Sequence, residues 1–234
     1  MHDTTDSDIA KKTWIIIPAY HEEAVVQSVI EEIRKSGFDN IIVIDDGSRD
    51  RTFNEAQKSG VVALRHRINR GKGAATKTGI EAAKKFNADV LVTMDGDGQH
   101  DPNDIYRLVA PIFEKRCDVV LGTRLRNTHG MPLYKIIGNY IGNFFTWYFY
   151  GLWVSDSQSG FRAYSRYAAE MIDTQTDRYE YDSEVIREIR THRLKFREVP
   201  IAVRYTKYSE TKAHRQNFTN GLKTLYKMIL RVLH

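Results

Sequence analysis

The sequence is poor in the residues that hold small secreted proteins together. It contains one cysteine, Cys117, which excludes an intrachain disulfide and suits a reducing compartment such as the cytoplasm. Its first eight residues are polar and acidic, whereas a cleavable signal peptide starts with a basic region and continues with an apolar one. With 234 residues, 41% of them hydrophobic and 28% charged, the chain is expected to form one large domain with at most an appendage.

Two common nucleotide-binding motifs are also missing. Gly71-Lys72-Gly73 lacks the spacing of a P-loop, and no G-x-G-x-x-G follows the first predicted strand, which argues against a P-loop ATPase and a dinucleotide oxidoreductase. No RNP, KH or zinc-finger pattern is present, which argues against nucleic-acid binding despite a net charge of +5. The positive charge is concentrated in residues 185–234, with twelve Lys and Arg against three Asp and Glu, and this end suits a phosphorylated or anionic lipid partner.

Short apolar segments alternate with helical patterns along the first half of the chain. The predicted strands are residues 14–17, 41–44, 61–64, 90–94 and 119–121, and the predicted helices between them are residues 22–35, 51–59, 73–86 and 103–115. This alternation predicts an α/β fold with a mostly parallel, Rossmann-like sheet flanked by helices. Ligands of such sheets bind beyond the carboxyl ends of the strands, where this chain carries polar groups after each of the predicted strands.

The most informative of these polar groups follows residues 90–94. Asp95, Asp97 and Gln99 offer hard oxygen ligands, which suit Mg²⁺ or Mn²⁺ shared with substrate phosphates. An EF-hand loop beginning at Asp95 is excluded, because its sixth position is His100 rather than Gly. The pattern predicts a metal site that neutralises a diphosphate leaving group.

Two segments of the second half suit a membrane surface. Residues 136–155 carry no charged side chain, and eight of these twenty residues are aromatic. Their Gly, Asn and Thr content argues against a spanning helix, so a buried core helix and a segment touching a membrane both stay open. Residues 217–233 form a predicted amphipathic helix with Lys223, Lys227 and Arg231 on one face. We expect residues 140–153 and this helix to hold the protein peripherally at the cytoplasmic face of a membrane.

Six motifs, taken in order, resemble the family 2 glycosyltransferases of the GT-A fold, and more closely the dolichyl- or polyprenyl-phosphate sugar synthases. They are Ile17-Pro-Ala-Tyr-His-Glu22, Asp45-Asp-Gly-Ser48, Asn69-Arg-Gly-Lys-Gly73, Met94-Asp-Gly-Asp-Gly-Gln-His-Asp-Pro102, Gly122-Thr-Arg124 and Asp156-Ser-Gln-Ser-Gly-Phe-Arg-Ala163. The resemblance covers residue 14 to about residue 165. Together with the amphipathic pattern described above, it leads us to expect three parts, which are a flexible N-terminus (1–12), a GT-A glycosyltransferase domain (13–212) and an amphipathic, membrane-surface C-terminal helix (213–234).

The resemblance also implies roles for individual residues. The residues that it assigns to the nucleotide sugar are Pro18, Tyr20, Glu22, Asp45, Asp46, Lys72 and Gly96. It makes Asp95, Asp97 and Arg124 the catalytic residues, and it gives the Mg²⁺ or Mn²⁺ ion to Asp95, Asp97 and Gln99. The contacts with the acceptor phosphate fall to Arg124, Ser159, Arg162, Lys207 and Lys212. The two lysines stand where many members carry a different Arg/Gly/Ser-Lys pattern.

The implied reaction is metal-dependent, inverting transfer of a hexose to a polyprenyl phosphate such as dolichyl or undecaprenyl phosphate. GDP-mannose, UDP-glucose and UDP-N-acetylhexosamine all stay open as donors, and membrane proteins are candidate partners. A phosphate monoester is already an anion and needs little general-base help, whereas a saccharide or protein acceptor would need a base such as Asp156 or Glu180. The alternative from another class is a non-catalytic nucleotide- or nucleic-acid-binding protein.

Overall fold

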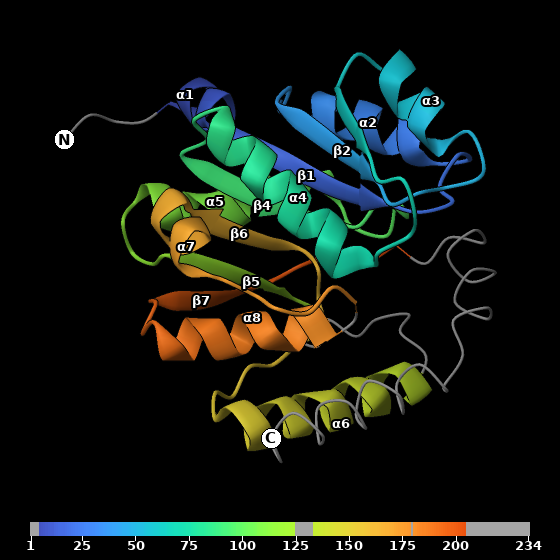
Figure 1. The fold of residues 1–234 in the computed structure, drawn as a ribbon. Coiled ribbons are helices and arrows are strands. Elements are labelled where there is room, and N and C mark those ends of the chain that lie inside the picture. Colours follow the sequence, from blue (N-terminus) through green and yellow to red (C-terminus); the bar gives the residue numbers. More distant parts are fainter. Residues whose placement is uncertain (1–4, 125–132, 179, 205–234) are drawn as a thin grey trace.

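The computed structural model of the chain describes residues 5–124, 133–178 and 180–204 (Figure 1). The predicted C-terminal helix, residues 213–234, and the predicted phosphate ligands Lys207 and Lys212 lie outside these ranges. The division into an N-terminus, a domain and a C-terminal helix therefore stays a prediction.

Seven strands form one sheet in the order β3-β2-β1-β4-β6-β5-β7. Their bounds are β1 Thr13–Ala19, β2 Ile41–Asp45, β3 Val62–Arg65, β4 Val90–Thr93, β5 Val119–Thr123, β6 Arg162–Ser165 and β7 Phe196–Pro200. The pairings β1–β2, β1–β4, β2–β3 and β5–β7 are parallel, while β6 runs antiparallel to both β4 and β5. The predicted α/β class and the five predicted strands are confirmed, and β6 and β7 are additions that the apolar pattern did not reveal.

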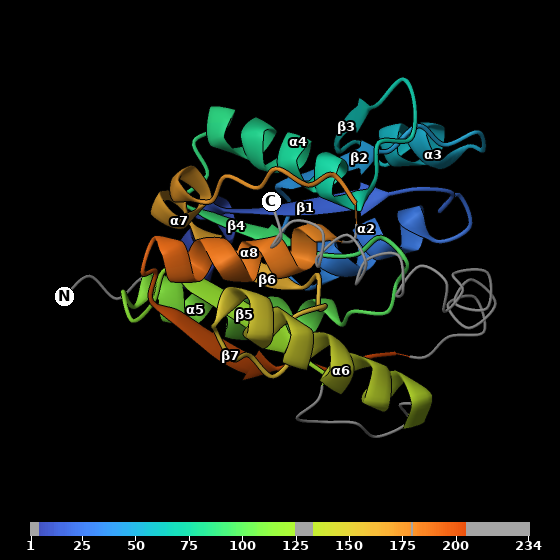
Figure 2. The ribbon, with the colours of Figure 1, turned by 60° about the horizontal axis from the view of Figure 1, so that its bottom comes forward.

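Helices cover both faces of this sheet (Figures 1 and 2). Their bounds are α1 Asp6–Lys12, α2 Val26–Lys35, α3 Thr52–Lys58, α4 Lys72–Lys85, the 3₁₀ turn η1 Pro102–Asp104, α5 Ile105–Phe113, α6 Leu133–Tyr150, α7 Arg166–Met171 and α8 Glu180–Thr191. The core on one face receives apolar side chains from α1, α2, α3 and α5, and the core on the other receives them from α4, α7 and α8. The spacing of Val26, Val29, Ile30 and Ile33 shows why α2 docks, because these buried residues form one stripe of the helix.

Within the segment predicted as a flexible N-terminus, residues 1–12, the structure describes the helix α1 over residues 6–12. The Thr5 hydroxyl accepts a hydrogen bond from the backbone N–H of Asp8 at 3.3 Å and caps the helix. Ile9 is 8% exposed and belongs to the core beneath α1. The segment is mostly polar, and the burial of Ile9, with Ala10 packed beside it, docks the helix on the core.

Helix α4 lies unusually close to the sheet because of Gly79. A Cβ at this position would come within 2.5 Å of Cδ1 of Ile44, so only glycine allows this approach. Gly79 thereby seats α4 against β1 and β2. The amino end of α4, which begins at Lys72, is held near the carboxyl ends of these strands.

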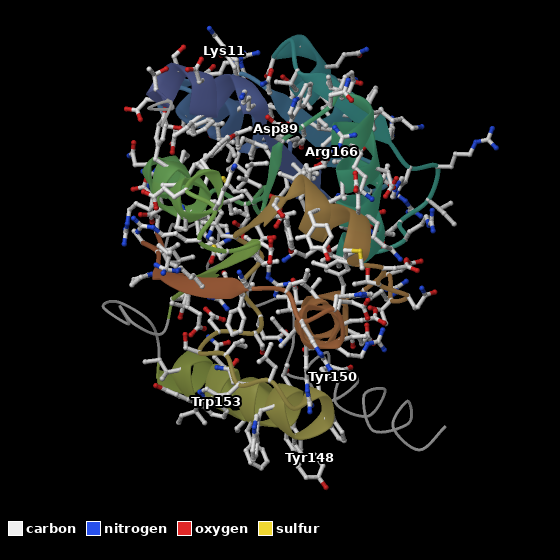
Figure 3. All side chains as sticks on the ribbon, turned by 90° about the vertical axis from the view of Figure 1, so that its left-hand side faces the viewer. Lys11, Asp89, Tyr148, Tyr150, Trp153 and Arg166 are labelled. Carbon is white, nitrogen blue, oxygen red and sulfur yellow. The ribbon has the colours of Figure 1, made fainter. Side chains whose placement is uncertain are left out.

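Helix α6 lies beside α8 at the lower edge of the molecule in Figure 1. Its inward face buries Asn143 and Thr146, while large apolar side chains of its other faces are about half exposed. These exposed side chains are Ile137, Tyr140, Ile141, Phe144, Trp147 and Tyr148, with Trp153 just beyond the helix. Figure 3 shows Tyr148 pointing away from the rest of the molecule. Of the two alternatives, a fully buried core helix is therefore wrong, and within the described ranges no helix has the length and apolar character to cross a membrane.

Candidate active site

The polar groups after β1 to β4 follow strands that pair in parallel, so they lie at the same carboxyl edge of the sheet. The centre of this edge is Asp95, which follows β4. Nζ of Lys72 lies 2.7 Å from Oδ1 of Asp95 and 3.5 Å from Oδ2 of Asp182, near the start of α8. Gly160, in the loop before β6, lies directly against this cluster. A Cβ at this position would lie only 2.5 Å from Nζ of Lys72. Residues from four distant parts of the sequence thus meet at one point.

The charges of this cluster stabilise one another. Burial alone would lower the pKa of Lys72, but the charges of Asp182 and Asp95 raise it above its ordinary value. Burial alone would raise the pKa of Asp95, but Lys72 and His100 hold it well below its usual range, with Nε2 of His100 3.3 Å from Oδ2 of Asp95. Asp95 is therefore an anion and Lys72 a cation throughout the physiological pH range.

The predicted metal ligands Asp97 and Gln99 continue from Asp95 on the same loop. Burial and the neighbouring charge of Asp95 raise the pKa of Asp97, so the two carboxylates are close enough to repel each other. The backbone N–H of Gln99 donates to Oδ1 of Asp97 at 3.0 Å and fixes the turn. Within the described ranges, no group of three or more His, Cys, Asp or Glu could hold a metal alone. Two adjacent carboxylates and an amide nevertheless fit a Mg²⁺ or Mn²⁺ ion that takes its other ligands from phosphate oxygens and water.

Residues 203 and 204, near the end of the described chain, hold the loop that carries the predicted metal ligands. Val203 forms an isolated antiparallel bridge with His100, and the backbone N–H of Arg204 donates to the Gln99 carbonyl at 2.8 Å. The Arg204 guanidinium lies 3.0 Å from Asp101 and also contacts Glu32 on α2. The sequence patterns did not predict this role of Arg204.

The residues predicted to hold the nucleotide lie on the β1 and β2 side of the edge. Tyr20 is 41% exposed, whereas Glu22 is buried and its backbone N–H donates to the Thr52 hydroxyl at 2.8 Å. Asp45 is fully buried, with Oδ2 3.0 Å from Nε of Arg65. Pro18 is half-buried at the end of β1, and Gly96 packs under it, because a Cβ on Gly96 would lie 3.2 Å from the Pro18 carbonyl oxygen. Direct contact of these residues with a nucleotide stays a prediction.

Asp46 has a positioning role that its sequence motif did not reveal. Its Oδ1 accepts a hydrogen bond from the backbone N–H of Arg70 at 3.0 Å and lies 2.7 Å from Nδ1 of His66. Its Oδ2 accepts a hydrogen bond from the N–H of Gly71 at 2.7 Å. Both oxygens are thus engaged by the loop that leads into α4 and Lys72. In this structure Asp46 thus fixes the conformation of the loop that precedes Lys72.

We expect Asp46→Ala to raise the Kd of the donor nucleotide by about tenfold, or about 1.4 kcal/mol. The same change should lower the free energy of unfolding by roughly 1 kcal/mol, because it removes the acceptor of the part-buried N–H groups of Arg70 and Gly71. Calorimetric titration and urea unfolding measure the two effects. Asp39→Ala, an exposed carboxylate before the other end of β2, is the matched control. An unchanged Kd together with a lowered free energy of unfolding would show that Asp46 has a structural role only.

The predicted acceptor residues lie on the β5 and β6 side. Arg124 donates from Nε and Nη2 to the two carboxylate oxygens of Asp156 at 2.7 and 2.8 Å, and its backbone N–H adds a third bond at 3.0 Å. Burial would raise the pKa of Asp156, but Arg124 lowers it below its ordinary value. Arg162 is 1% exposed and donates to the carbonyl oxygens of Ser157 and Asp182. The structure thus gives Arg162 a place beneath the acceptor loop rather than on its surface.

Ser159 and Glu180 complete the predicted set on this side. Both are buried, at 1% and 7% exposure, and the Ser159 hydroxyl has no hydrogen-bond partner within the described residues. Asp182 was missed by sequence reasoning. Its only signal is its place in the first turn of α8, where acidic residues are common for helix stability alone.

The family model for glycosyl transferase family 2 matches residues 14–172, the stretch that contains the Lys72–Asp95 pair, Asp97 and the Arg124–Asp156 pair. The chain belongs to glycosyltransferase family 2. The resemblance of its motifs is thereby confirmed, and the protein is an enzyme that transfers a sugar.

This family 2 glycosyltransferase is similar to proteins of archaea and bacteria over most of its length. It is 41% identical to an uncharacterized protein of Methanocaldococcus jannaschii, over 93% of this chain and 91% of the other. It is 36% identical to the UDP-N-acetylglucosamine–dolichyl-phosphate N-acetylglucosaminyltransferase of Methanococcus voltae, over 94% and 96%. It is 28% identical to the polyprenol monophosphomannose synthase of Mycolicibacterium smegmatis, over 70% and 65%.

Solved structures confirm the fold of this glycosyltransferase as the GT-A type. Glucosyl-3-phosphoglycerate synthase of Mycobacterium tuberculosis superposes with a TM-score of 0.69, at 20% identity, over 96% of this chain and 82% of that one. A second structure of that enzyme, with a TM-score of 0.68 and 21% identity over 94% and 82%, holds Mn²⁺, uridine diphosphate and phosphoglyceric acid. At this identity the likeness concerns the arrangement of the chain.

Proposed function

We propose that this glycosyltransferase moves a sugar from a nucleoside-diphosphate sugar to a polyprenyl phosphate, with inversion at the anomeric carbon. The observation that carries the proposal is the ion pairing of the acceptor side. Both carboxylate oxygens of Asp156 accept hydrogen bonds from the Arg124 guanidinium. The Asp182 carboxylate lies 3.5 Å from Nζ of Lys72 and 3.4 Å from Nη2 of Arg162. Carboxylates so engaged are weak bases, which disfavours activation of a sugar hydroxyl and favours an acceptor that is already an anion.

The chemistry follows from the charges at the edge of the sheet. An oxygen of the acceptor phosphate would attack the anomeric carbon while the bond to the nucleoside diphosphate breaks on the opposite side. A Mg²⁺ or Mn²⁺ ion held by Asp95, Asp97 and Gln99 would supply positive charge to the departing diphosphate. The Lys72 ammonium, 2.7 Å from Asp95, adds a fixed positive charge at the same place. Arg124 would attract the acceptor phosphate on the other side through its positive charge, while its fork holds Asp156.

The named relatives support the acceptor class more firmly than the sugar. One is named for N-acetylglucosamine and another for mannose, while both are named for a polyprenyl-type lipid phosphate or alcohol. We propose UDP-N-acetylhexosamine as the first donor to test, because the relative named for it matches nearly the whole chain at 36% identity. UDP-glucose and GDP-mannose complete the panel.

The purified protein tests the proposal directly. It is incubated with Mn²⁺, each sugar nucleotide in turn, and either a polyprenyl phosphate or a panel of free saccharides, and products are identified by mass spectrometry. We expect a sugar-phosphoryl-polyprenol with one donor and no glycosylated saccharide. Transfer to a saccharide at an equal or higher rate would replace the acceptor assignment. Binding of the nucleotide without transfer to any acceptor would contradict the proposed reaction.

We further propose that the exposed aromatic face of α6 rests on a lipid surface, where the acceptor's hydrocarbon tail stays. Half-exposed tyrosine and tryptophan side chains suit the membrane–water interface, since their rings are apolar and their polar atoms stay wet. The predicted basic helix with Lys223, Lys227 and Arg231 would add attraction to anionic headgroups.

Removing aromatic side chains from this face should weaken lipid binding. We expect Phe144→Ser/Tyr148→Ser to bind vesicles of anionic lipid about tenfold more weakly in co-sedimentation, a loss of about 1.4 kcal/mol. Tyr167→Ser is the matched control, because this tyrosine is 55% exposed on α7 rather than α6. Equal binding by the double variant and the control would show that α6 does not face lipid.

A further inference from the structure

The inward face of α6 is polar, although the helix is otherwise rich in aromatic residues. Asn143 and Thr146 lie one turn apart on this face, and they are 1% and 0% exposed. A buried amide or hydroxyl costs free energy unless its hydrogen bonds are made, so apolar residues would pack the helix against α8 at lower cost. The partners of these side chains show what the polar residues accomplish.

Asn143 binds the backbone on both sides of Asp156. Its Nδ2 donates to the Ser155 carbonyl oxygen at 2.6 Å, and its Oδ1 accepts from the backbone N–H of Ser157 at 2.8 Å. The Ser157 hydroxyl donates to the same Oδ1 at 2.9 Å. One side chain thus holds residues 155–157 much as a neighbouring strand would, and it fixes the direction in which the Asp156 carboxylate leaves the backbone.

Further buried hydrogen bonds connect this loop to α8. The Thr146 hydroxyl lies 3.3 Å from the Ser157 hydroxyl and 3.1 Å from the Ser183 hydroxyl. Nε2 of Gln158 donates to the Ser183 hydroxyl at 3.0 Å. The loop that carries Asp156 is therefore held by polar contacts to α6 and α8.

A separate contact fixes the loop from the side of β7. The backbone N–H and the hydroxyl of Ser155 both donate to Oε1 of Glu198, at 2.6 and 2.7 Å. With residues on both sides of it held, the Asp156 carboxylate accepts hydrogen bonds from the Arg124 fork described above. The direction of the Arg124 guanidinium thus depends on contacts that Arg124 does not make itself. They are the hydrogen bonds that Asn143 and Glu198 make with the residues on either side of Asp156.

We infer that Asn143 is a positioning residue for the acceptor site, which acts through Asp156 to aim Arg124, and that Thr146 assists it. The inference rests on the proposed function, in which Arg124 receives the acceptor phosphate. It assigns α6 two tasks on opposite faces. The outer face provides the surface contact, and the inner face fixes the arginine that meets the phosphate at that surface.

The test is the kinetics of Asn143→Leu, which keeps the approximate size of the side chain and removes its hydrogen bonds. We expect the KM for polyprenyl phosphate to rise, or kcat/KM to fall, by about tenfold to a hundredfold, as for a displaced positioning group. The Kd for Mn²⁺ with uridine diphosphate should change by less than about twofold, because the donor side is untouched. Asn139→Ala, an asparagine one turn earlier on α6, is the matched control. If Asn143→Leu fails to fold, Thr146→Val gives the same test with a smaller effect.

A double variant separates positioning from a general loss of stability. If Asn143 acts through Arg124, Asn143→Leu/Arg124→Lys should transfer no more slowly than Arg124→Lys alone, within about twofold. Additive losses in the double variant, or an unchanged KM and an unchanged kcat/KM for the acceptor in Asn143→Leu, would overturn the inference. Failure of the proposed function is distinguishable, because the wild-type protein would then transfer no sugar to polyprenyl phosphate at all.

Discussion

Asp97→Ala should lower sugar transfer by roughly a hundredfold to a thousandfold or more, with little change in the melting temperature. Removing one group that stabilises developing charge commonly costs this much in other enzymes. The substitution removes one of the two carboxylates that are predicted to hold the divalent cation. The fold should tolerate the change, since burial and Asp95 already raise the pKa of Asp97 and disfavour its charge. Transfer rate, Mn²⁺ affinity with uridine diphosphate and thermal unfolding are the measurements.

The matched control is Asp89→Ala, at the opposite end of the same strand. Asp89 precedes β4 and makes a long, exposed ion pair with Lys12 at 3.8 Å, so its loss should leave transfer unchanged. Chelation of divalent ions with EDTA should reproduce the Asp97→Ala result in the wild-type protein. Full activity in EDTA, or in the alanine variant, would refute the metal assignment.

Gly160→Ala should reduce transfer by about a hundredfold although it adds only one methyl group. The new Cβ would lie 2.5 Å from Nζ of Lys72 and 2.7 Å from Oδ1 of Asp95, at the centre of the site. Both atoms end movable side chains, so the chain can fold around the methyl group, but the Lys72–Asp95 pair must shift. A displacement of about 1 Å at a reacting centre can cost about a hundredfold in rate.

Gly138→Ala is the corresponding control for adding a methyl group. A Cβ at Gly138 would meet nothing within 4 Å, and the residue lies within α6. This change should leave transfer unchanged and should stabilise the helix by about 0.5–1 kcal/mol. Equal activity of Gly160→Ala and Gly138→Ala would mean that the loop before β6 lies farther from the reaction than the structure places it.

The predictable part of this protein is the part with a regular apolar pattern. The strands over 41–44 and 90–94 are mostly apolar segments followed at once by acidic residues, and in a parallel sheet such segments place those residues at one edge. The Asp95 cluster could therefore be located from the sequence. The role of Lys72 came with its motif, and the structure adds that it binds Asp95 and Asp182 together.

The unpredicted part depends on contacts that leave no local pattern. β6 begins with the buried Arg162, a residue that argues against a central strand until its partners on α8 are known. Asn143 reads as an interruption of an apolar helix, yet its amide holds a loop twelve to fourteen residues later in the chain. Asp46 is predicted to bind the nucleotide sugar, and the structure adds that both of its oxygens bind the protein's own backbone. In each case the polar side chain is explained by a partner distant in sequence.

The position of β6 also affects how the chain can fold during its synthesis. β6 lies between β4 and β5 in the sheet, but it is made after β5 and after the whole of α6. While residues 162–165 are still inside the ribosome, the edge of β4 has no strand to pair with, and an open apolar edge invites association with other chains. The block β3-β2-β1-β4 can assemble early, because its strands are consecutive in sequence. More than sixty further residues must then be synthesised before β6 can pair with the open edge of β4. We therefore expect the nascent glycosyltransferase to be most dependent on chaperones while the acceptor half of its sheet is being translated.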